Sequence, residues 1–517
     1  MPSAAPRADA GARPGFRSHG LTLCRAAERG LDAAVGAQAN PLRHLGTVAC
    51  GAFWLLAATG VVLYAVLDTS VQGAWTSIEA LHDAPLHAGQ LLRGLHRYAA
   101  DLLVLATLAH LLREWLHAHE RGARRYTWLT GVPLIAFAAA SGVGGFWLNW
   151  DQLGQYSAMA TAAWVDALPL LSSPLSRNFL DAAAVGDRLF SLFVFVHLGV
   201  PLLMLFGLWF HVQRLSRAAV LPPRPLAVAL AAALAAAALL WPVVSHPPAL
   251  AGAEPAVLRL DWVLLLVHPL TEATSPAAVW ALVLGGAVLL FVLPFLPQPP
   301  RPPVAEVAPQ ACNGCTRCVD DCPYAAITMV PHPNQRIGRQ LAVVDADLCV
   351  GCGICAGACP SGTPFRSAGA LVNGIDLPGL TVDALRSLLR GRLAAARDLQ
   401  PVVVFGCAHG ARLPVGRDVV AMALPCAAQL PPSFVEYALR DGAGAVVVAA
   451  CRESGCEFRL GERITAERLH ARREPHLRLQ HLPAGRVVLA HAGAGDEAVV
   501  AAAVQRLRAG VRTEAAS

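Results

Sequence analysis

The chain has 517 residues, of which 55% are hydrophobic and 15% are charged. Its mean hydropathy of +0.48 argues against an ordinary soluble enzyme. The net charge is +6, and every basic residue is an arginine. These arginines gather in short loops rather than in one stripe with interleaved aromatic residues, so the charge does not support nucleic-acid binding. At about 150 residues per domain, three or four domains are expected.

Apolar stretches of about 20 residues, long enough to cross a bilayer, lie almost wholly before residue 298. The arginine-rich loops after the second and fourth stretches are expected in the cytoplasm, which places the second half of the chain there as well. Residues 1–45 are expected to be a cytoplasmic segment without a secretory signal. We predict an all-α transmembrane bundle of about six spans. The predicted spans are 46–66, 94–116, 128–148, 188–212, 225–244 and 277–297.

The second half of the chain has the pattern of a soluble redox protein. A proline-rich segment at 299–308 cannot continue a helix and is expected to be a stiff linker. Twelve of the fourteen cysteines follow residue 311, in spacings that indicate metal ligation rather than disulfides. The other two, Cys24 and Cys50, are expected to be structural. Between 400 and 460, β-rich runs alternate with helical ones, which predicts an α/β unit.

Two predicted spans carry pairs of histidines at one spacing. His96 and His110 are fourteen residues apart, and so are His197 and His211. Fourteen helical residues make nearly four turns, so each pair lies on one helix face, about 21 Å apart along the axis. Imidazole is a good axial ligand for haem iron, and ligation offsets the cost of a histidine inside a membrane. We predict one haem between His96 and His197 near the outer face, and another between His110 and His211 near the inner face.

Glycines on two other spans repeat the same interval. Gly46 and Gly60 lie fourteen residues apart on the first span, as do Gly131 and Gly145 on the third. We expect these glycines where the flat macrocycles need close approach of the backbone. The alternative is a bundle in which the histidines and glycines only pack, but four matched intervals favour haem binding.

Residues 20–298 resemble the cytochrome b family of quinol-oxidising bc-type complexes. Beyond the histidine pairs, the resemblance rests on Thr-Trp-Leu-Thr-Gly at 127–131, Gly-Phe-Trp-Leu-Asn-Trp-Asp-Gln at 145–152 and the segment 187–197. The family implies a four-helix dihaem core, here 46–215, followed by two further transmembrane helices in 216–298.

The same resemblance implies two b-type haems with quinone pockets beside them, contact with membrane lipid and a possible homodimer. We expect the protein in the inner (cytoplasmic) membrane of a bacterium. Arg97 and Arg113 become candidates for partners of the haem propionates. Their alternative interpretation is that of interfacial arginines that only snorkel to the membrane surface.

The outer quinol site departs from the family pattern. Where the family has Pro-Glu-Trp-Tyr, this chain has Leu260-Asp261-Trp262-Val263. Asp261 keeps a carboxylate able to accept a quinol proton, although on a shorter arm and without the tyrosine. It is therefore the candidate catalytic residue. The extra covalent haem of one subgroup is not expected, because His44 stands where its attaching cysteine would be.

Two cysteine runs of the form CxxCxxCxxxCP, within 309–369, resemble bacterial two-cluster ferredoxins. In such a run the fourth cysteine ligates the other cluster, so two [4Fe-4S] clusters are expected. Tetrahedral zinc is the weaker alternative, because it requires neither the three-cysteine ladder nor the prolines that follow. The predicted ligand sets are Cys312, Cys315, Cys318 and Cys359 for one cluster, and Cys349, Cys352, Cys355 and Cys322 for the other.

Four more cysteines lie in 370–510, each after a β-rich run or turn. This region resembles the delta (iron-sulfur) subunit of methyl-viologen-reducing hydrogenases, which implies a [2Fe-2S] cluster and electron transfer to a flavoprotein of the heterodisulfide-reductase kind. Structural thiols remain the alternative, and a catalytic nucleophile is disfavoured because no histidine or acid is tied to any of the four. The predicted ligands are Cys407, Cys426, Cys451 and Cys456.

Together these patterns predict a multidomain chain: the helical membrane bundle, a ferredoxin-like α+β cluster domain and an α/β iron-sulfur domain. Its expected function is that of a membrane electron-transfer subunit, linking quinone or quinol to a cytosolic heterodisulfide-reductase-like or hydrogenase-like flavoprotein. The sequence shows no flavin, nicotinamide or Rieske pattern, so this oxidoreductase needs partner subunits. The alternatives are a subunit of an electron-bifurcating quinol-oxidising complex, which needs a working Asp261, and a haem/iron-sulfur redox sensor.

Overall fold

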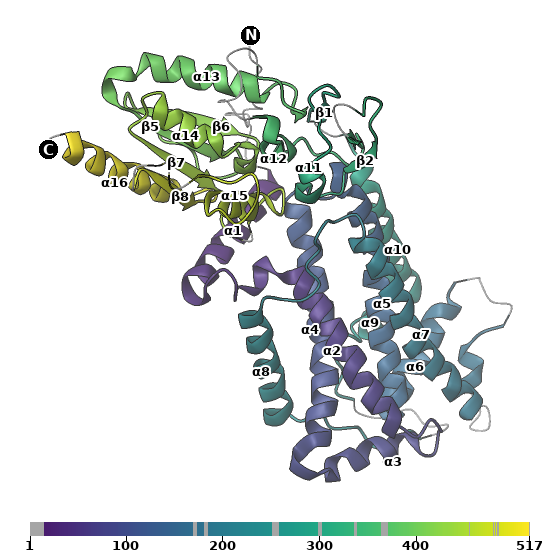
Figure 1. Ribbon diagram of the computed structural model, residues 1–517. Coiled ribbons are helices and arrows are strands. Elements are labelled where there is room, and N and C mark those ends of the chain that lie inside the picture. Colours follow the sequence, from purple (N-terminus) through teal and green to yellow (C-terminus); the bar gives the residue numbers. More distant parts are fainter. Residues whose placement is uncertain are drawn as a thin grey trace. The chain divides into compact units, whose positions relative to one another are not determined.

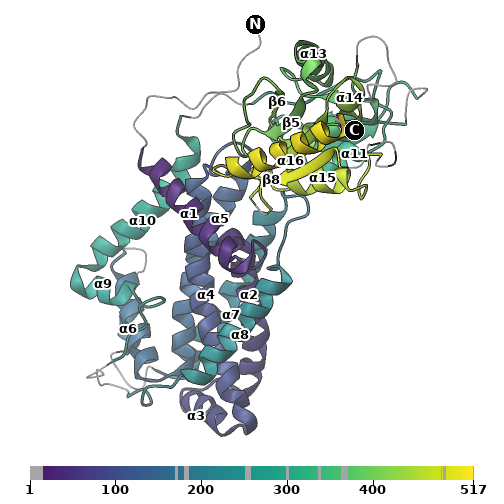
Figure 2. The ribbon, with the colours of Figure 1, turned by 90° about the vertical axis from the view of Figure 1, so that its left-hand side faces the viewer.

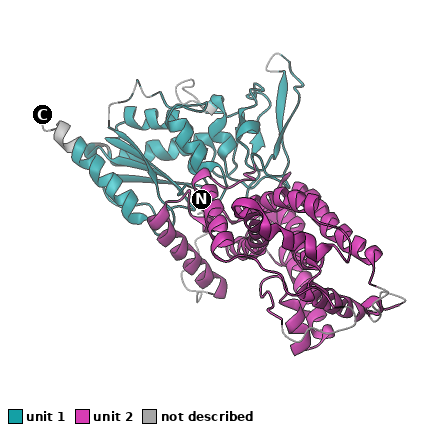
Figure 3. Cartoon of the chain, turned by 90° about the horizontal axis from the view of Figure 1, so that it is seen from below, with its two compact units in different colours: residues 1–13, 214–217, 299–517 teal, residues 14–213, 218–298 magenta. Residues whose placement is uncertain are grey.

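The computed structural model describes residues 15–168, 173–179, 185–250, 258–297, 302–335, 339–362, 371–453, 455–478, 480, 482 and 485–515. The chain forms two units (Figure 3). One comprises residues 14–213 and 218–298, and its described residues form helices but no strand. The other comprises 299–517 with 214–217 and contains the sheets. The predicted order, a helical membrane-type region followed by α/β domains, is confirmed.

Four long helices form the centre of the first unit (Figure 1). Taken in chain order, the second of these four helices packs against the first along its length, and the fourth packs against the third in the same way. Small and apolar residues from all four, including Ala52, Leu103, Ala138 and Met204, share one buried core. The helices are α2 (Leu45–Val66), α4 (Ala88–Leu116), α5 (Arg125–Asn149) and α7 (Asp187–Val212).

Among the described residues, four helices are long and apolar enough to cross a membrane: α2, α5, α7 and α10 (Pro276–Val292) with the turn that extends it. The apolar helix α8 (Arg224–Leu240) has only 17 residues. Although α4 has 29 residues, charged side chains along it lower its hydropathy. The structure thus shows four to five apolar helices where six spans were predicted, and the helix that carries His96 and His110 is the polar one.

Four shorter helices were not predicted, because they are too short or too polar to register as spans: α1 (Phe16–Val35), α3 (Ala74–Glu79), α6 (Gln152–Asp166) and α9 (Val267–Ala273). The helix α9 contacts both α6 and α10 (Figure 2). The rings of Trp164 on α6 and Trp280 on α10 stack with centroids 4.0 Å apart. The helix α1 lies within the expected N-terminal segment 1–45, whose first 14 residues lie outside those described.

The first part of the second unit is a small α+β body built around the two cysteine runs. A short helix carries the third cysteine of each run and ends directly before the fourth: α11 (Arg317–Asp321) and α12 (Ile354–Ala358). The strands β2 (Ile327–Pro331) and β3 (Gln340–Val344) pair antiparallel. A second antiparallel pair, β1 (Glu306–Val307) with β4 (Ile375–Asp376), joins the two ends of this body. It lies outside the expected range 309–369, and residues 299–301 of the expected linker are not among those described.

The rest of the second unit is a four-stranded parallel sheet of order β6-β5-β7-β8, covered by helices on both faces. Two of its strands coincide with the predicted β-rich runs, and every residue of both is buried, as expected of parallel strands. The strands are β5 (Val402–Cys407), β6 (Val419–Leu424), β7 (Ala445–Ala450) and β8 (Val487–His491). The helices are α13 (Val382–Ala395) and α14 (Ser433–Arg440) on one face, α16 (Glu497–Ala515) on the other, and α15 (Gly461–Leu469).

A buried ion pair joins the two parts of this unit. Arg468, on α15, is only 1% exposed. Its guanidinium donates to Asp321 Oδ2 over 2.5 Å, to Ala428 O over 2.7 Å and to Ile354 O over 3.3 Å. Asp321 also accepts from Arg473 over 2.6 Å. Because Asp321 and Ile354 belong to the cysteine-run body and Arg468 and Ala428 to the sheet body, this charge fixes one part against the other.

Replacing Arg468 tests whether its buried charge holds the two parts of this unit together. An Arg468→Met variant should lose about 3 kcal/mol of stability, because Asp321 keeps only Arg473 and two carbonyls lose their donor. The readout is thermal loss of the visible iron-sulfur absorbance in the full-length protein. Arg463→Met is the matched control, since Arg463 lies on the same helix, is 63% exposed and pairs only with Glu467 in the described residues. It should change stability by about 0.5 kcal/mol or less. Equal midpoints for both variants would contradict the role of Arg468.

Candidate haem and iron-sulfur sites

The outer histidine pair lies across the interior of the helical unit. His96 projects from α4 and His197 from α7, and their ring centroids are 6.3 Å apart with an interplanar angle of 65°. Bonds between a metal and an imidazole nitrogen are about 2 Å long, so this gap accommodates one metal centre between the rings. The structure therefore brings together the two residues predicted to share a haem.

Hydrogen bonds orient both rings of this pair. His197 Nδ1 donates to the carbonyl oxygen of Ser141 over 3.0 Å, because a carbonyl can only accept. The hydroxyl of Thr59 donates to Leu55 O over 2.7 Å and lies 2.9 Å from His96 Nδ1, which donates to it. With both Nδ1 atoms protonated, both Nε2 atoms keep the lone pair that iron requires. Thr59 was not among the predicted site residues, although a hydroxyl within an apolar span is itself a signal of function.

Each of the four predicted glycines faces the imidazole ring of a predicted ligand on the neighbouring helix. A side chain on any of them would press against the ring and displace it. We expected these glycines beside the macrocycles, whereas their direct neighbours here are the histidine rings. A Cβ atom would lie 3.2 Å from His110 Cε1 at Gly46, 3.1 Å from His96 Cε1 at Gly60, 2.9 Å from His211 Cε1 at Gly131 and 3.1 Å from His197 Cε1 at Gly145.

The two arginines suggested as propionate partners are paired with carboxylates of the protein. Arg97 lies 2.7 Å from Asp101 Oδ1 and also contacts Asp261. Arg113 Nε lies 2.9 Å from Glu28 Oε1. Each arginine lies within three residues of a predicted ligand histidine, but in this structure its guanidinium is paired with a carboxylate of the protein.

Asp261, the candidate proton acceptor, has contacts on both carboxylate oxygens. Its Oδ1 accepts from the backbone N–H groups of Val263 over 2.9 Å and Leu264 over 2.7 Å, while Oδ2 contacts Arg97. The carboxylate therefore both shapes its own turn and balances the charge of Arg97, the residue after His96.

The eight cysteines of the two runs separate into the two predicted sets. The thiol of Cys318 interacts electrostatically with those of Cys312, Cys315 and Cys359. A cavity is lined by all four members of the other set, Cys322, Cys349, Cys352 and Cys355. Burial raises the pKa of both Cys318 and Cys352 to about 12. Thiols with such a pKa stay protonated near neutral pH, so cluster binding would release protons and depend on pH.

The last four cysteines meet at one edge of the parallel sheet. Cys407 ends β5, Cys426 follows β6 and Cys451 follows β7. Since the carboxyl ends of parallel strands lie at the same edge of a sheet, these three cysteines come together there. The Sγ atoms of Cys407 and Cys451 are 3.4 Å apart. Hydrogen bonds from the thiols of Cys426 and Cys451 lower the pKa of Cys456.

A glycine completes this group. A Cβ at Gly461 would lie 2.3 Å from Cys426 Sγ and 3.1 Å from Cys456 Sγ, so α15 can begin beside the thiols only because this residue has no side chain. Four thiols gathered at one edge of the sheet, two of them from the connection between β7 and α15, fit the ligand set of a single iron-sulfur cluster. Nothing in the spacing of the cysteines predicted this role of Gly461.

Comparison with known families agrees with this geometry. The chain matches Cytochrome b/b6/petB over residues 32–219, the 4Fe-4S dicluster domain over 311–363 and the methyl-viologen-reducing hydrogenase delta subunit over 398–513. The chain combines these three domains. It is therefore a membrane electron-transfer protein with b-type haem and two [4Fe-4S] clusters. A solved structure described as "Hyperthermophilic respiratory Complex III" is similar over 49% of this chain and 75% of that chain, with 18% identity and a TM-score of 0.38.

The glycine contacts predict which of the two expected haems a substitution removes. A Gly131→Val variant should lose the haem predicted between His110 and His211 and keep the one predicted between His96 and His197, because the new side chain enters the space of the His211 ring. Haem content per protein and the reduced b-band spectrum measure this loss. Gly285→Val is the control, since a Cβ there meets nothing within 4 Å. Full haem content in the Gly131 variant would contradict the assignment.

Proposed function

We propose that this protein conducts electrons between the quinone pool of a bacterial cytoplasmic membrane and a cytosolic redox partner, through two b haems, two [4Fe-4S] clusters and one [2Fe-2S] cluster. The haems and clusters supply the one-electron chemistry, while the chain holds, spaces and tunes them. The observation that carries this proposal is the arrangement of the three cysteine sets in series.

The middle position belongs to the set that includes Cys352 and Cys355. Cys355 interacts electrostatically with Cys318 of the first set. Cys352 interacts with Cys456 and Cys426 of the third set. Electrons entering either outer set therefore have the middle set as their neighbour.

The contact between the middle and third sets is dry and closely packed. Ile354, between two cysteines of the middle set, is fully buried in one apolar cluster with Cys352 and Cys426. Its Cδ1 atom lies 3.7 Å from the position that a Cβ atom at residue 461, the glycine beside the third set, would occupy. The guanidinium of Arg468 also donates to Ile354 O. A buried positive charge favours added electrons, so Arg468 contributes to the reduction potential of the clusters beside it as well as to the fold.

The remaining parts of the proposal follow from the family domains and the charge pattern. The arginine-rich loops favour the cytoplasm for the iron-sulfur domains, and the hydrogenase delta domain favours a flavoprotein partner of the heterodisulfide-reductase or hydrogenase kind. Quinone or quinol would exchange electrons with the haems, and a homodimer would be the assembled form.

Optical redox titration of the protein in membranes tests continuity of the path. A quinol analogue should reduce the b haems. A low-potential reductant that reduces the clusters should also lead to reduction of the haems. In a Cys456→Ser variant the third cluster should be lost, while haem spectra and both [4Fe-4S] signals in electron paramagnetic resonance remain. Haems that respond to quinol but not to reduced clusters would show that the soluble unit is a separate sensor or docking module.

We also propose Asp261 as the acceptor of a quinol proton at the outer site. An Asp261→Asn variant should slow quinol-dependent haem reduction by about tenfold or more, since an amide cannot accept the proton. Its Oδ1 can still cap the turn at Val263 and Leu264, so haem content should not change. Asp101→Asn is the control, because it removes the other carboxylate partner of Arg97 and leaves Asp261 in place. Equal rates in the two variants would exclude the proposed role.

A further inference from the structure

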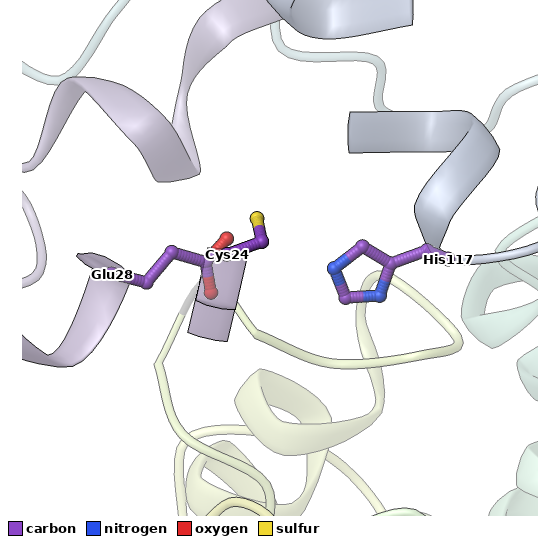
Figure 4. A group of neighbouring side chains, drawn as sticks. All are labelled: Cys24, Glu28 and His117. Atoms are coloured by element: carbon purple, nitrogen blue, oxygen red, sulfur yellow. The ribbon is translucent and has the colours of Figure 1, made fainter. Parts of the chain in front are cut away.

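A thiol, a carboxylate and an imidazole meet at one end of the helical unit, outside the haem and cluster sites. Cys24 and Glu28 are four residues apart on one face of α1, and His117 directly follows the last residue of α4 (Figure 4). One ligand atom from each of the three lies within 4.8 Å of the other two. Neither Cys24 nor His117 has a role in the electron path described above.

The imidazole is aimed into this group. In Figure 4 the ring nitrogen farther from the backbone, Nε2, points toward Cys24 and Glu28. This Nε2 atom is buried and has no hydrogen-bond partner among the described residues. A buried polar atom without a partner costs free energy, which a bound ligand would recover.

Of the two carboxylate oxygens of Glu28, Oε2 is the one that could bind a metal ion. Its Oε1 accepts from Arg113 Nε over 2.9 Å, whereas Oε2 lies 3.8 Å from Arg43 Nη1, beyond hydrogen-bonding distance. Arg43 is bound instead to Asp32, over 2.8 and 2.6 Å. The nearest cations are thus partly compensated by other carboxylates, and the Glu28–Arg113 bond orients the group as partners of metal ligands commonly do.

The frame around the site is held by contacts between α1 and the end of α4. Arg17 donates to Glu120 over 2.9 and 2.7 Å, and Glu120 is only 1% exposed. Glu28 is 4% exposed and bonded to Arg113. Ion pairs on both sides of Cys24 therefore keep the three candidate ligands at a fixed separation.

We propose that Cys24, Glu28 and His117 bind a zinc-class divalent cation, with water in the fourth position. Thiolate, imidazole and carboxylate together form a donor set typical of Zn²⁺. A doubly charged cation with one thiolate and one carboxylate is neutral overall, which limits repulsion from the arginines nearby. The Cys24 thiol loses its proton to solvent when the metal binds. The bound ion would clamp α1 to the end of α4, two turns beyond His110.

Zinc content of the holoprotein tests the site, because twelve other thiols are engaged when the clusters are loaded. The full chain, with haem and iron content verified, is stripped with a chelator that leaves iron in place, equilibrated with Zn²⁺ and desalted before elemental analysis. Wild type and Cys50→Ser should hold one more zinc per chain than Cys24→Ser and His117→Gln. Glu28 is left unchanged, since its substitution would also break the Arg113 contact. Equal zinc in all four proteins overturns the proposal.

A second measurement uses only the wild-type protein, so it does not depend on whether a variant folds. Alkylation of Cys24 in wild type, followed by mass spectrometry of its peptide, should slow about tenfold or more when Zn²⁺ is present, because metal binding removes the free thiolate. Mg²⁺ should give no protection, since it prefers oxygen ligands. Alkylation at one rate with and without Zn²⁺ also overturns the proposal.

Discussion

The contact between a glycine and an imidazole ring, made four times, is the constraint on which the membrane unit depends. A bulky histidine can lie inside a tightly packed helix pair only where the facing helix has no side chain. The helices α2 and α5 carry glycines at the same spacing at which α4 and α7 carry histidines. The helix pairs α2–α4 and α5–α7 can therefore each pack closely at two positions along their length. Helix packing and ligand placement are therefore one arrangement, and neither can change without the other.

The second unit holds three cysteine sets at fixed separations with no disulfide between its two parts among the described residues. Parallel strands bring Cys407, Cys426 and Cys451 to one edge, and Gly461 leaves space beside them. The buried Arg468–Asp321 pair then fixes the cysteine-run body against that edge. A buried ion pair contributes little net stability but strongly disfavours alternative docking, because any slip leaves a charge unpaired.

The sequence was sufficient wherever the signal is periodic or local. Fixed spacing predicts His96, His110, His197 and His211 as ligands, and the cysteine runs predict both sets of four; the structure places His96 opposite His197. Long-range partners could not be predicted, since nothing in the sequence near Arg468 indicates Asp321, 147 residues away. The helix α1 was missed for a related reason. It is too polar to register as a span, and its contacts with α4 and the turn after it arise from residues about 85 to 103 positions apart.

The charges beside the haem sites show how the membrane unit remains stable with arginines near its interior. Arg97 is balanced by Asp101 and Asp261, and Arg113 is balanced by Glu28. An uncompensated guanidinium in a low-dielectric region would be costly, so each arginine needs an anionic partner at all times. Arg97 therefore joins two carboxylates, Asp101 on its own helix and Asp261 about 160 residues further along the chain, through one guanidinium.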